Sequence, residues 1–327
     1  MKKSIVFLVV CLLITLCIGP AQATIKKVAQ TGFQFLRVDV GSRAAAMGGA
    51  YMMVGDDATA MFYNPAGLAK MSAGLDVFAG QTRWISDITY NSVALVKNLG
   101  NWGTVGLSGI FADYGTIEGT RVASNSQGYE ETGNVDVGAY TVSLSYARNL
   151  SDKFTVGGQI KYVSQHLGSN LRVGGTTKDN TMSGLAYDFG TIFYPGFKSF
   201  RFGMSIRNFS KEFKYEQEGF QLPLTFYIGI AMDVMDFLGE HKNPLILAVD
   251  ATHPRDYTER LNIGGEYTFM NMVALRAGYK YNYDQEGLTL GIGIMQKLVG
   301  IRFHLDYAYS NTDVFDVVNR FSVGFSF

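Results

Sequence analysis

The sequence predicts an all-β protein: a 14-stranded antiparallel transmembrane β-barrel with a short, partly helical N-terminal plug. Three observations lead to this prediction. Apolar and polar residues alternate repeatedly, over segments of ten or more residues. After the first 23 residues, no apolar run approaches the roughly 20 residues that a membrane-spanning helix needs. The chain also ends in an alternating aromatic stretch, RFSVGFSF.

The composition agrees with a barrel and excludes other classes. The 327 residues are 47% hydrophobic and 13% aromatic, and the mean hydropathy of +0.07 is too low for a helical membrane protein. Only 17% are charged, whereas soluble domains carry roughly 25%. Loss of the two lysines in the predicted signal leaves 26 basic residues against 28 acidic ones. A net charge of −2 offers no basic field for nucleic acid.

Residues 1–23 are predicted to be a cleaved signal peptide. Two lysines precede an apolar run at 5–19, and an A-x-A pattern ends at Ala23. The run is shorter than a membrane anchor requires. Both cysteines, Cys11 and Cys17, lie in this segment, so the mature chain is expected to have neither a disulfide nor a thiol.

The barrel is predicted over residues 74–327, where alternation sends successive side chains to opposite faces of a sheet. A soluble β-sandwich also alternates, but its strands are usually about 5–6 residues long. Long alternating segments separated by turns are typical of a transmembrane barrel, which closes because lipid cannot satisfy a free sheet edge. Fourteen strands are expected, near 75–84, 87–97, 102–113, 135–147, 153–165, 183–194, 199–209, 222–234, 244–253, 260–269, 273–283, 287–296, 300–311 and 317–327.

The lengths of the connections predict the orientation of the barrel. Short turns recur after even-numbered strands, with one long exception at 235–242, and the longest connections, 114–134, 166–182 and 210–221, follow odd-numbered ones. Short periplasmic turns and longer external loops are the rule for outer-membrane barrels. We therefore expect a multi-pass protein of the outer membrane of a diderm bacterium, surrounded by outer-membrane lipid, with both termini in the periplasm.

The last strand is expected to close the barrel. Its aromatic side should face lipid, and it resembles the C-terminal signal that the barrel-assembly machinery reads; this signal comprises Phe321, Val323, Phe325 and Phe327. Tyrosines near strand ends suit an interfacial girdle. The candidates for this girdle are Tyr279, Tyr281, Tyr283, Tyr307 and Tyr309.

Charged residues on the opposite strand face are predicted to point into the lumen. Their signs are mixed, which favours ion pairs that stiffen a narrow, plugged lumen over a one-sign ring of an ion-selective pore. The residues are Lys161, Asp188, Arg201, Arg207, Asp233, Asp250, Glu266, Arg276, Lys280, Arg302, His304 and Asp306.

Residues 24–73 do not alternate and are predicted to form the plug, because irregular backbone can find hydrogen-bond partners inside a lumen. Ser42 is a candidate cap for a short helix that Gly48 and Gly49 would end. Asp56 or Asp57 is a candidate cap for a second helix. Asn64, followed by Pro65, would cap a third.

This segment carries a family resemblance. GSRAAAMGGAYMMVGDDATAMFYNPAGLA (41–69) resembles the N-terminal block of the PorV/PorQ family within the FadL-like group of outer-membrane barrels. The shared parts are the run at 43–50, the acidic pair at 56–58 and the Asn-Pro-Ala-Gly at 64–67. The resemblance implies a fourteen-stranded barrel and gives these residues a plug or gate role: Arg43, Met47, Gly48, Gly49, Asp56, Asp57, Asn64, Pro65, Ala66 and Gly67.

The resemblance implies two functions, and both remain open. PorV-like proteins receive cargo with a C-terminal signal domain from the type IX translocon and carry it to the cell surface, while PorQ assists surface attachment. FadL-like proteins move hydrophobic small molecules across the outer membrane. A solute channel needs a lateral opening, which the glycines of the third and fifth strands would allow, although glycine also relieves crowding in a tilted barrel. A purely structural barrel is a third alternative. We favour the secretion role.

No enzyme or cofactor is predicted. The four histidines, His166, His241, His253 and His304, have no metal-ligand spacing. The pair His304 and Asp306 resembles half of a catalytic triad, but no Gly-x-Ser-x-Gly elbow is present. The GDDAT stretch has fewer oxygen ligands than a calcium loop requires, and helix capping explains it more simply.

Overall fold

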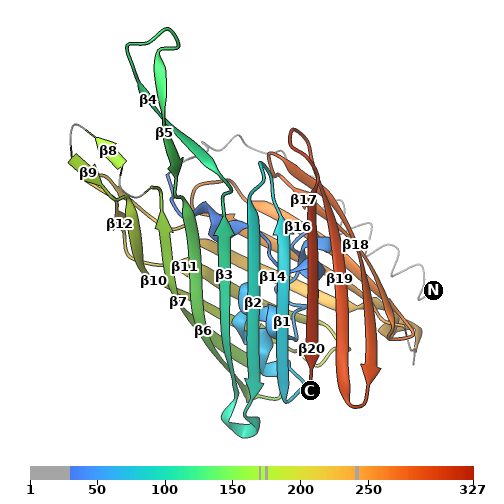
Figure 1. The fold of residues 1–327 in the computed structure, drawn as a ribbon. Coiled ribbons are helices and arrows are strands. Elements are labelled where there is room, and N and C mark those ends of the chain that lie inside the picture. Colours follow the sequence, from blue (N-terminus) through green and yellow to red (C-terminus); the bar gives the residue numbers. More distant parts are fainter. Residues whose placement is uncertain (1–29, 169–170, 174–175, 240–242) are drawn as a thin grey trace.

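The computed structural model describes residues 30–168, 171–173, 176–239 and 243–327. The predicted signal peptide, 1–23, lies outside the described residues. Fourteen antiparallel strands form a closed barrel (Figure 1). In order around the barrel, they are β1 (Leu75–Arg83), β2 (Thr89–Asn98), β3 (Thr104–Asp113), β6 (Gly138–Ser151), β7 (Phe154–His166), β10 (Thr181–Phe193), β11 (Arg201–Phe209), β14 (Thr225–Asp233), β15 (Leu245–Pro254), β16 (Arg260–Phe269), β17 (Val273–Tyr281), β18 (Glu286–Leu298), β19 (Ile301–Thr312) and β20 (Val318–Ser326).

Each predicted strand is present, which confirms the predicted fold class. The three longest connections also contain small hairpins, which the sequence did not predict. These are β4 (Ile117–Val122) with β5 (Tyr129–Val135), β8 (Leu171–Val173) with β9 (Thr176–Lys178), and β12 (Phe213–Lys214) with β13 (Gly219–Phe220). All three lie at one end, called here the long-loop end, and β4–β5 projects well beyond the barrel (Figure 1). The opposite end is called the short-turn end; its long connection begins with η5 (Val234–Leu238).

The barrel wall is apolar outside and polar inside. In the β3–β6 pair, Leu107 lies opposite Leu144, and their exposed fractions are 51% and 61%. The next pair, Ser108 and Ser143, is buried. A soluble sandwich would bury the leucines, so this arrangement excludes that alternative and fits a wall that faces lipid. Within the described ranges, no helix has both the length and the apolar character needed to cross a membrane.

The last strand closes the barrel against the first. β20 pairs with both β19 and β1, and the backbone N–H of Gly74 donates to the carbonyl of Phe327 at 2.7 Å. Phe321, Phe325 and Phe327 are exposed on the outer face, Val323 is half-buried, and the alternating small residues are buried. The strand therefore has the predicted faces, and its role as an assembly signal stays a prediction.

The segment before β1 lies inside the barrel (Figure 1). It contains η1 (Gln34–Arg37), α2 (Ser42–Ala46), η2 (Ala58–Phe62) and η3 (Pro65–Lys70), and three of these are 3₁₀ rather than α-helical. Residues 31–73 are called the plug below. The plug supplies most of the buried apolar residues, including Met47, Tyr51 and Leu68, and wall residues such as Val96 and Ile192 complete the cluster.

The predicted caps are partly correct. Asp57 accepts a hydrogen bond from the backbone of Thr59, and Asn64 accepts one from Ala66 with Pro65 in the first helical position. Gly41, not Ser42, caps α2, because the Ser42 side chain already lies within the first turn. Gly48 and Gly49 end this helix in the left-handed region, with φ of 65° and 76°, as predicted.

The chain crosses the lumen once before it enters the wall. Thr31 and Gly32 pair with Gln221 at the long-loop end, whereas β1 begins beside Phe327 at the short-turn end. The C-terminus lies at the short-turn end (Figure 1); its periplasmic location stays a prediction. The first described residues lie at the opposite end, because the plug must traverse the barrel to reach β1; the N-terminus itself is outside the described residues.

One further expectation needs revision. Tyr283 does not join a lipid-facing girdle: the left-handed Asn282, with φ 64°, breaks the alternation after β17, and Tyr283 turns into the lumen. The glycines of β3 and β7, left open by the sequence as a place for a lateral opening, lie in continuous ladders: β3 pairs with both neighbours, and β7 with β10, without a register shift. A bulge lies instead between β10 and β11, beside Tyr187 and Phe189.

We expect the long-loop end to face the outside of the cell. Val122 in β4 is 94% exposed, and Val299 in the β18–β19 turn is fully exposed at the other end. In the cysteine-free mature chain, Val122→Cys should react with a membrane-impermeant maleimide on intact cells. Val299→Cys should react only after the outer membrane is permeabilised. The reverse labelling pattern would show that the barrel has the opposite orientation in the membrane.

Candidate functional site

The plug rests on glycines of the wall. At eight inward-facing positions, an added Cβ would meet plug atoms: backbone atoms at three of them and side chains at the other five. Gly264 and Gly278 lie against Met47 and Gly48, while Gly157 lies against the backbone of Pro65 and Ala66. The remaining positions are Gly106, Gly190, Gly203, Gly229 and Gly291.

Side chains of the wall satisfy the irregular backbone of the plug. Asp76 accepts from the backbone N–H of Ala58 at 2.9 Å, and Asp250 accepts from that of Met52 at 2.9 Å. Thr289 donates to the carbonyl of Ala46 at 3.0 Å, and Arg201 donates to that of Met53. Because the plug lacks long helices, these wall groups replace the partners that regular structure would supply.

A chain of ion pairs joins the plug to the wall. Arg43 binds Glu266 with two hydrogen bonds, of 2.7 and 2.8 Å. Glu266 also accepts from Arg276 at 2.6 Å, and Arg276 reaches Asp306 at 2.6 Å. Glu266 is 3% exposed and lies between two guanidinium groups. Two-pronged contacts of this kind fix geometry as well as charge. We call Arg43, Glu266, Arg276 and Asp306 the plug lock.

Arg43 also contacts two carboxylates of the plug itself. Arg43 lies 3.2 Å from Asp56 and 3.3 Å from Asp57, but all three belong to the plug. These contacts hold two plug segments together, and Glu266 makes the connection to the wall. Burial raises the pKa of Asp57, but Arg43 and His304 more than offset this effect and hold its pKa below the usual value.

A second ionic group ties the plug nearer the long-loop end. Lys280 donates to Asp39 at 2.8 Å and to Glu286 at 2.7 Å, and Arg320 donates to the Asp39 carbonyl at 2.8 Å. Burial raises the pKa of the Asp39 carboxyl, but the positive charges of Lys280 and Arg320 outweigh it and keep the pKa below its usual value. Asp39 therefore stays ionised at neutral pH.

The other predicted lumen residues either pair with each other along the wall, line one of the two end cavities, or cap a turn. Lys161 binds Asp188 at 2.6 Å beside the β10–β11 bulge. Arg302 and His304 face a cavity at the short-turn end, which Asp57, Asp76 and Asp306 also line. Arg207 lines a cavity at the long-loop end, and Asp233 caps η5.

Two cavities lie on opposite sides of the plug. The long-loop cavity measures about 520 Å³ and the short-turn cavity about 530 Å³. Between them the plug fills the lumen, since Ala44, Met47, Ala50 and Tyr51 are completely buried. The arrangement closes the barrel to anything of protein size, and it holds no group of three metal-ligating side chains within the described ranges.

Sequence reasoning missed several of these contacts. Arg320 alternates with the outward Phe321, so its inward position was readable from the strand pattern. The role of Asp39 could not be predicted from the sequence pattern, because it lies in a segment without periodicity. Its partner Lys280 is 241 residues away in the chain, and only the fold brings the two together.

These features define an outer-membrane β-barrel whose lumen is closed by an N-terminal plug. Residues 21–253, which are more than half of the chain, match the family described as type IX secretion system protein PorV. The chain belongs to this family and is an outer-membrane barrel of the type IX secretion group. No curated protein sequence matches it.

Solved FadL-like barrels share the fold. The monoaromatic hydrocarbon channel CymD is 14% identical, with a TM-score of 0.60 over 89% of this chain and 98% of its own. A Pseudomonas aeruginosa FadL homologue is 13% identical, with a TM-score of 0.54 over 89% and 98%. The Pseudomonas putida toluene transporter TodX is 12% identical, with a TM-score of 0.53 over 86% and 96%. At these identities the likeness concerns the fold alone.

The plug lock should contribute strongly to stability. Glu266→Gln leaves Arg43 and Arg276 side by side without their shared counter-charge, and breaking a buried pair in this way costs roughly 3–5 kcal/mol. We expect the free energy of unfolding, measured by urea titration in detergent micelles, to fall by about that amount. Glu130→Gln, in the exposed Arg121–Glu130 pair, is the control and should change little. Equal effects of the two substitutions would show that the lock is not a stabilising contact.

Two adjacent glycines of β7 test the seating of the plug. Gly157→Ala puts a methyl group into the backbone of Pro65 and Ala66, whereas at Gly158 the nearest atoms are 3.8 Å away. Overpacking typically costs about 1–3 kcal/mol. We therefore expect Gly157→Ala to lower the free energy of unfolding, or to raise ion conductance in planar bilayers by displacing the plug. Gly158→Ala should behave like the parent, and similar behaviour of both variants would contradict the close approach.

Proposed function

We propose that this protein carries secreted proteins at the outer membrane: it receives cargo with a C-terminal signal domain from the type IX translocon and delivers it to the cell surface. The proposal places the short-turn end in the periplasm and the long loops outside. The family match over residues 21–253 is the observation that carries it.

The closed lumen supports a carrier over a protein-conducting channel. A folded domain of about 100 residues has a radius of gyration of about 13 Å and so occupies at least roughly 9,000 Å³, whereas each cavity measures only about 520–530 Å³. Cargo would therefore contact the outer surface or the loops of the barrel. The β4–β5 hairpin, which projects beyond the wall (Figure 1), is available for such a contact.

Transport of a hydrophobic solute is the second candidate. The two cavities and the fold shared with CymD and TodX favour it, because a small solute would need only a local movement of the plug. The plug lock and the close contacts between the plug and the wall glycines oppose such movement. In either role the plug residues 43–67 act as a gate or seal, and no catalytic role is proposed for them.

Affinity purification of the tagged protein from native outer membranes, under gentle conditions, separates the two candidates. Mass spectrometry should find a very large barrel together with proteins that share a C-terminal signal domain. A tagged, unrelated outer-membrane barrel from the same cells is the control. Recovery of the protein alone, enriched in a hydrophobic compound, would overturn the secretion role and support solute transport.

A further inference from the structure

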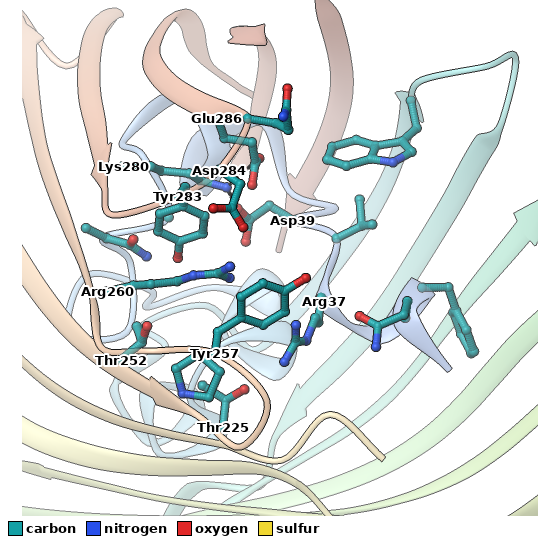
Figure 2. Close-up of a pocket in the computed structure, with 18 of the residues that line it drawn as sticks. Arg37, Asp39, Thr225, Thr252, Tyr257, Arg260, Lys280, Tyr283, Asp284 and Glu286 are labelled. Carbon is teal, nitrogen blue, oxygen red and sulfur yellow. Dashed lines mark hydrogen bonds and ion pairs between the residues drawn. The ribbon is translucent and has the colours of Figure 1, made fainter. Parts of the chain in front are cut away.

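The long-loop cavity has the features of a ligand site that the secretion role does not use. It lies where the β1–β2, β15–β16 and β17–β18 loops meet, with plug residues 34–39 on one side. Its volume of about 520 Å³ is within the range of small-molecule sites. Figure 2 shows basic, acidic and tyrosine side chains converging on it from the wall and the plug.

Cations and tyrosine rings alternate along one side of this cavity. Arg260 lies 4.1 Å from the ring centre of Tyr257 and 4.3 Å from that of Tyr283. Arg37 lies over Tyr257 at 4.9 Å, and Lys280 over Tyr283 at 5.2 Å. The central guanidinium is thus held by rings on both sides (Figure 2). Stacking occupies the faces of a guanidinium and leaves the N–H groups at its edge for hydrogen bonds.

The outer cations of this row are already paired, but the central one has an open donor. Arg37 binds Asp256, and Lys280 binds Asp39 and Glu286. The Nε–H of Arg260 is buried and has no hydrogen-bond partner among the described residues. A buried donor without a partner is unfavourable, so the position is suited to an acceptor that arrives from outside.

Arg207 repeats this pattern elsewhere in the cavity lining. Its guanidinium lies 5.6 Å from the ring centres of both Tyr63 and Tyr227. The Nε–H of Arg207 is also buried without a partner among the described residues. Two stacked guanidinium groups in one cavity, each with an open donor, favour a carboxylate or phosphate oxygen as the acceptor.

Neighbouring groups suggest what else the ligand carries. Thr252 and Asn262 line the same cavity and are each 4% exposed, and Thr252 Oγ1 and Asn262 Oδ1 have no partner in the described part of the chain. An amide oxygen requires a donor, such as a hydroxyl group. The lining holds four Arg or Lys and three Asp or Glu residues, and Asp256, outside the lining, neutralises Arg37, so the cavity has no large excess of either charge. A monoanion suits that balance better than a polyanion.

We propose that the long-loop cavity binds a small organic monoanion, with its carboxylate or phosphate at Arg260 or at Arg207 and its body among the tyrosine rings. Hydroxyl groups on the ligand would meet Asn262 and Thr252. This ligand class differs from the neutral hydrocarbons named for the CymD and TodX structures. This site does not depend on the proposed secretion role, and a binding measurement tests it separately.

The two tryptophans provide a direct test. Trp84 lines the cavity, while Trp102 is 81% exposed at the other end of the barrel. In a Trp102→Phe protein, purified in detergent, Trp84 is the single tryptophan, and its fluorescence reports on the cavity. The probes are cyclohexanecarboxylate, cyclohexyl phosphate and the neutral cyclohexylmethanol.

We expect saturable changes with at least one anion, at concentrations at least tenfold lower than with the alcohol. The comparison of carboxylate with phosphate identifies the preferred head group. Arg260→Gln should weaken anion binding about tenfold or more and leave the alcohol unaffected, and Arg207→Gln should act likewise if the first variant does not fold. Arg121→Gln, in the exposed β4 strand, is the matched control and should bind like the parent.

Two results would overturn the proposal. If neither anion gives a saturable change, the cavity is not an anion site. If the alcohol binds as tightly as the anions and the arginine variants bind normally, it is an apolar pocket. Folding of each variant is verified by the shift in electrophoretic mobility of a barrel between unheated and heated samples.

Discussion

One constraint governs this structure: the closed sheet faces lipid outside, so its polar face turns inward and every polar group there needs a partner. If water alone filled the lumen and served as that partner, the barrel would be an open channel. The chain instead places its own N-terminal segment in the lumen, and Glu266, between Arg43 and Arg276, joins this segment to the wall. The plug in turn has little regular structure, and its backbone depends on wall residues such as Asp76 and Asp250.

Packing and electrostatics act together in holding the plug. Wall glycines let the backbones of Met47 and Ala66 approach the sheet closely, and ion pairs then form over short distances away from water. Either feature alone would be weaker. Without the close approach, the ion pairs would be hydrated and screened, and without the ion pairs, the small apolar contacts of α2 would be easily displaced.

The closed lumen also separates the two ends of the molecule chemically. The short-turn cavity is bordered by the plug lock and His304, whereas the long-loop cavity is lined by stacked arginines and tyrosines. This PorV-family barrel therefore has a cavity at each end while its centre is filled by the plug. The long-loop cavity would let a small molecule bind without crossing the membrane.

The sequence alone determined the wall of this protein. Alternation with period two is a local property, so Leu107, Leu144 and the residues of β20 revealed the strands, their faces and their number. The caps at Asp57 and Asn64 are also local and were readable. The tertiary structure decided the path of the plug and the partners of the charges. Arg43 and Glu266 are 223 residues apart, and the plug has no periodicity, so nothing local specifies that they meet. Tyr283 shows the limit within the wall itself: one left-handed residue, Asn282, turned a lipid-facing pattern into a lining of the long-loop cavity.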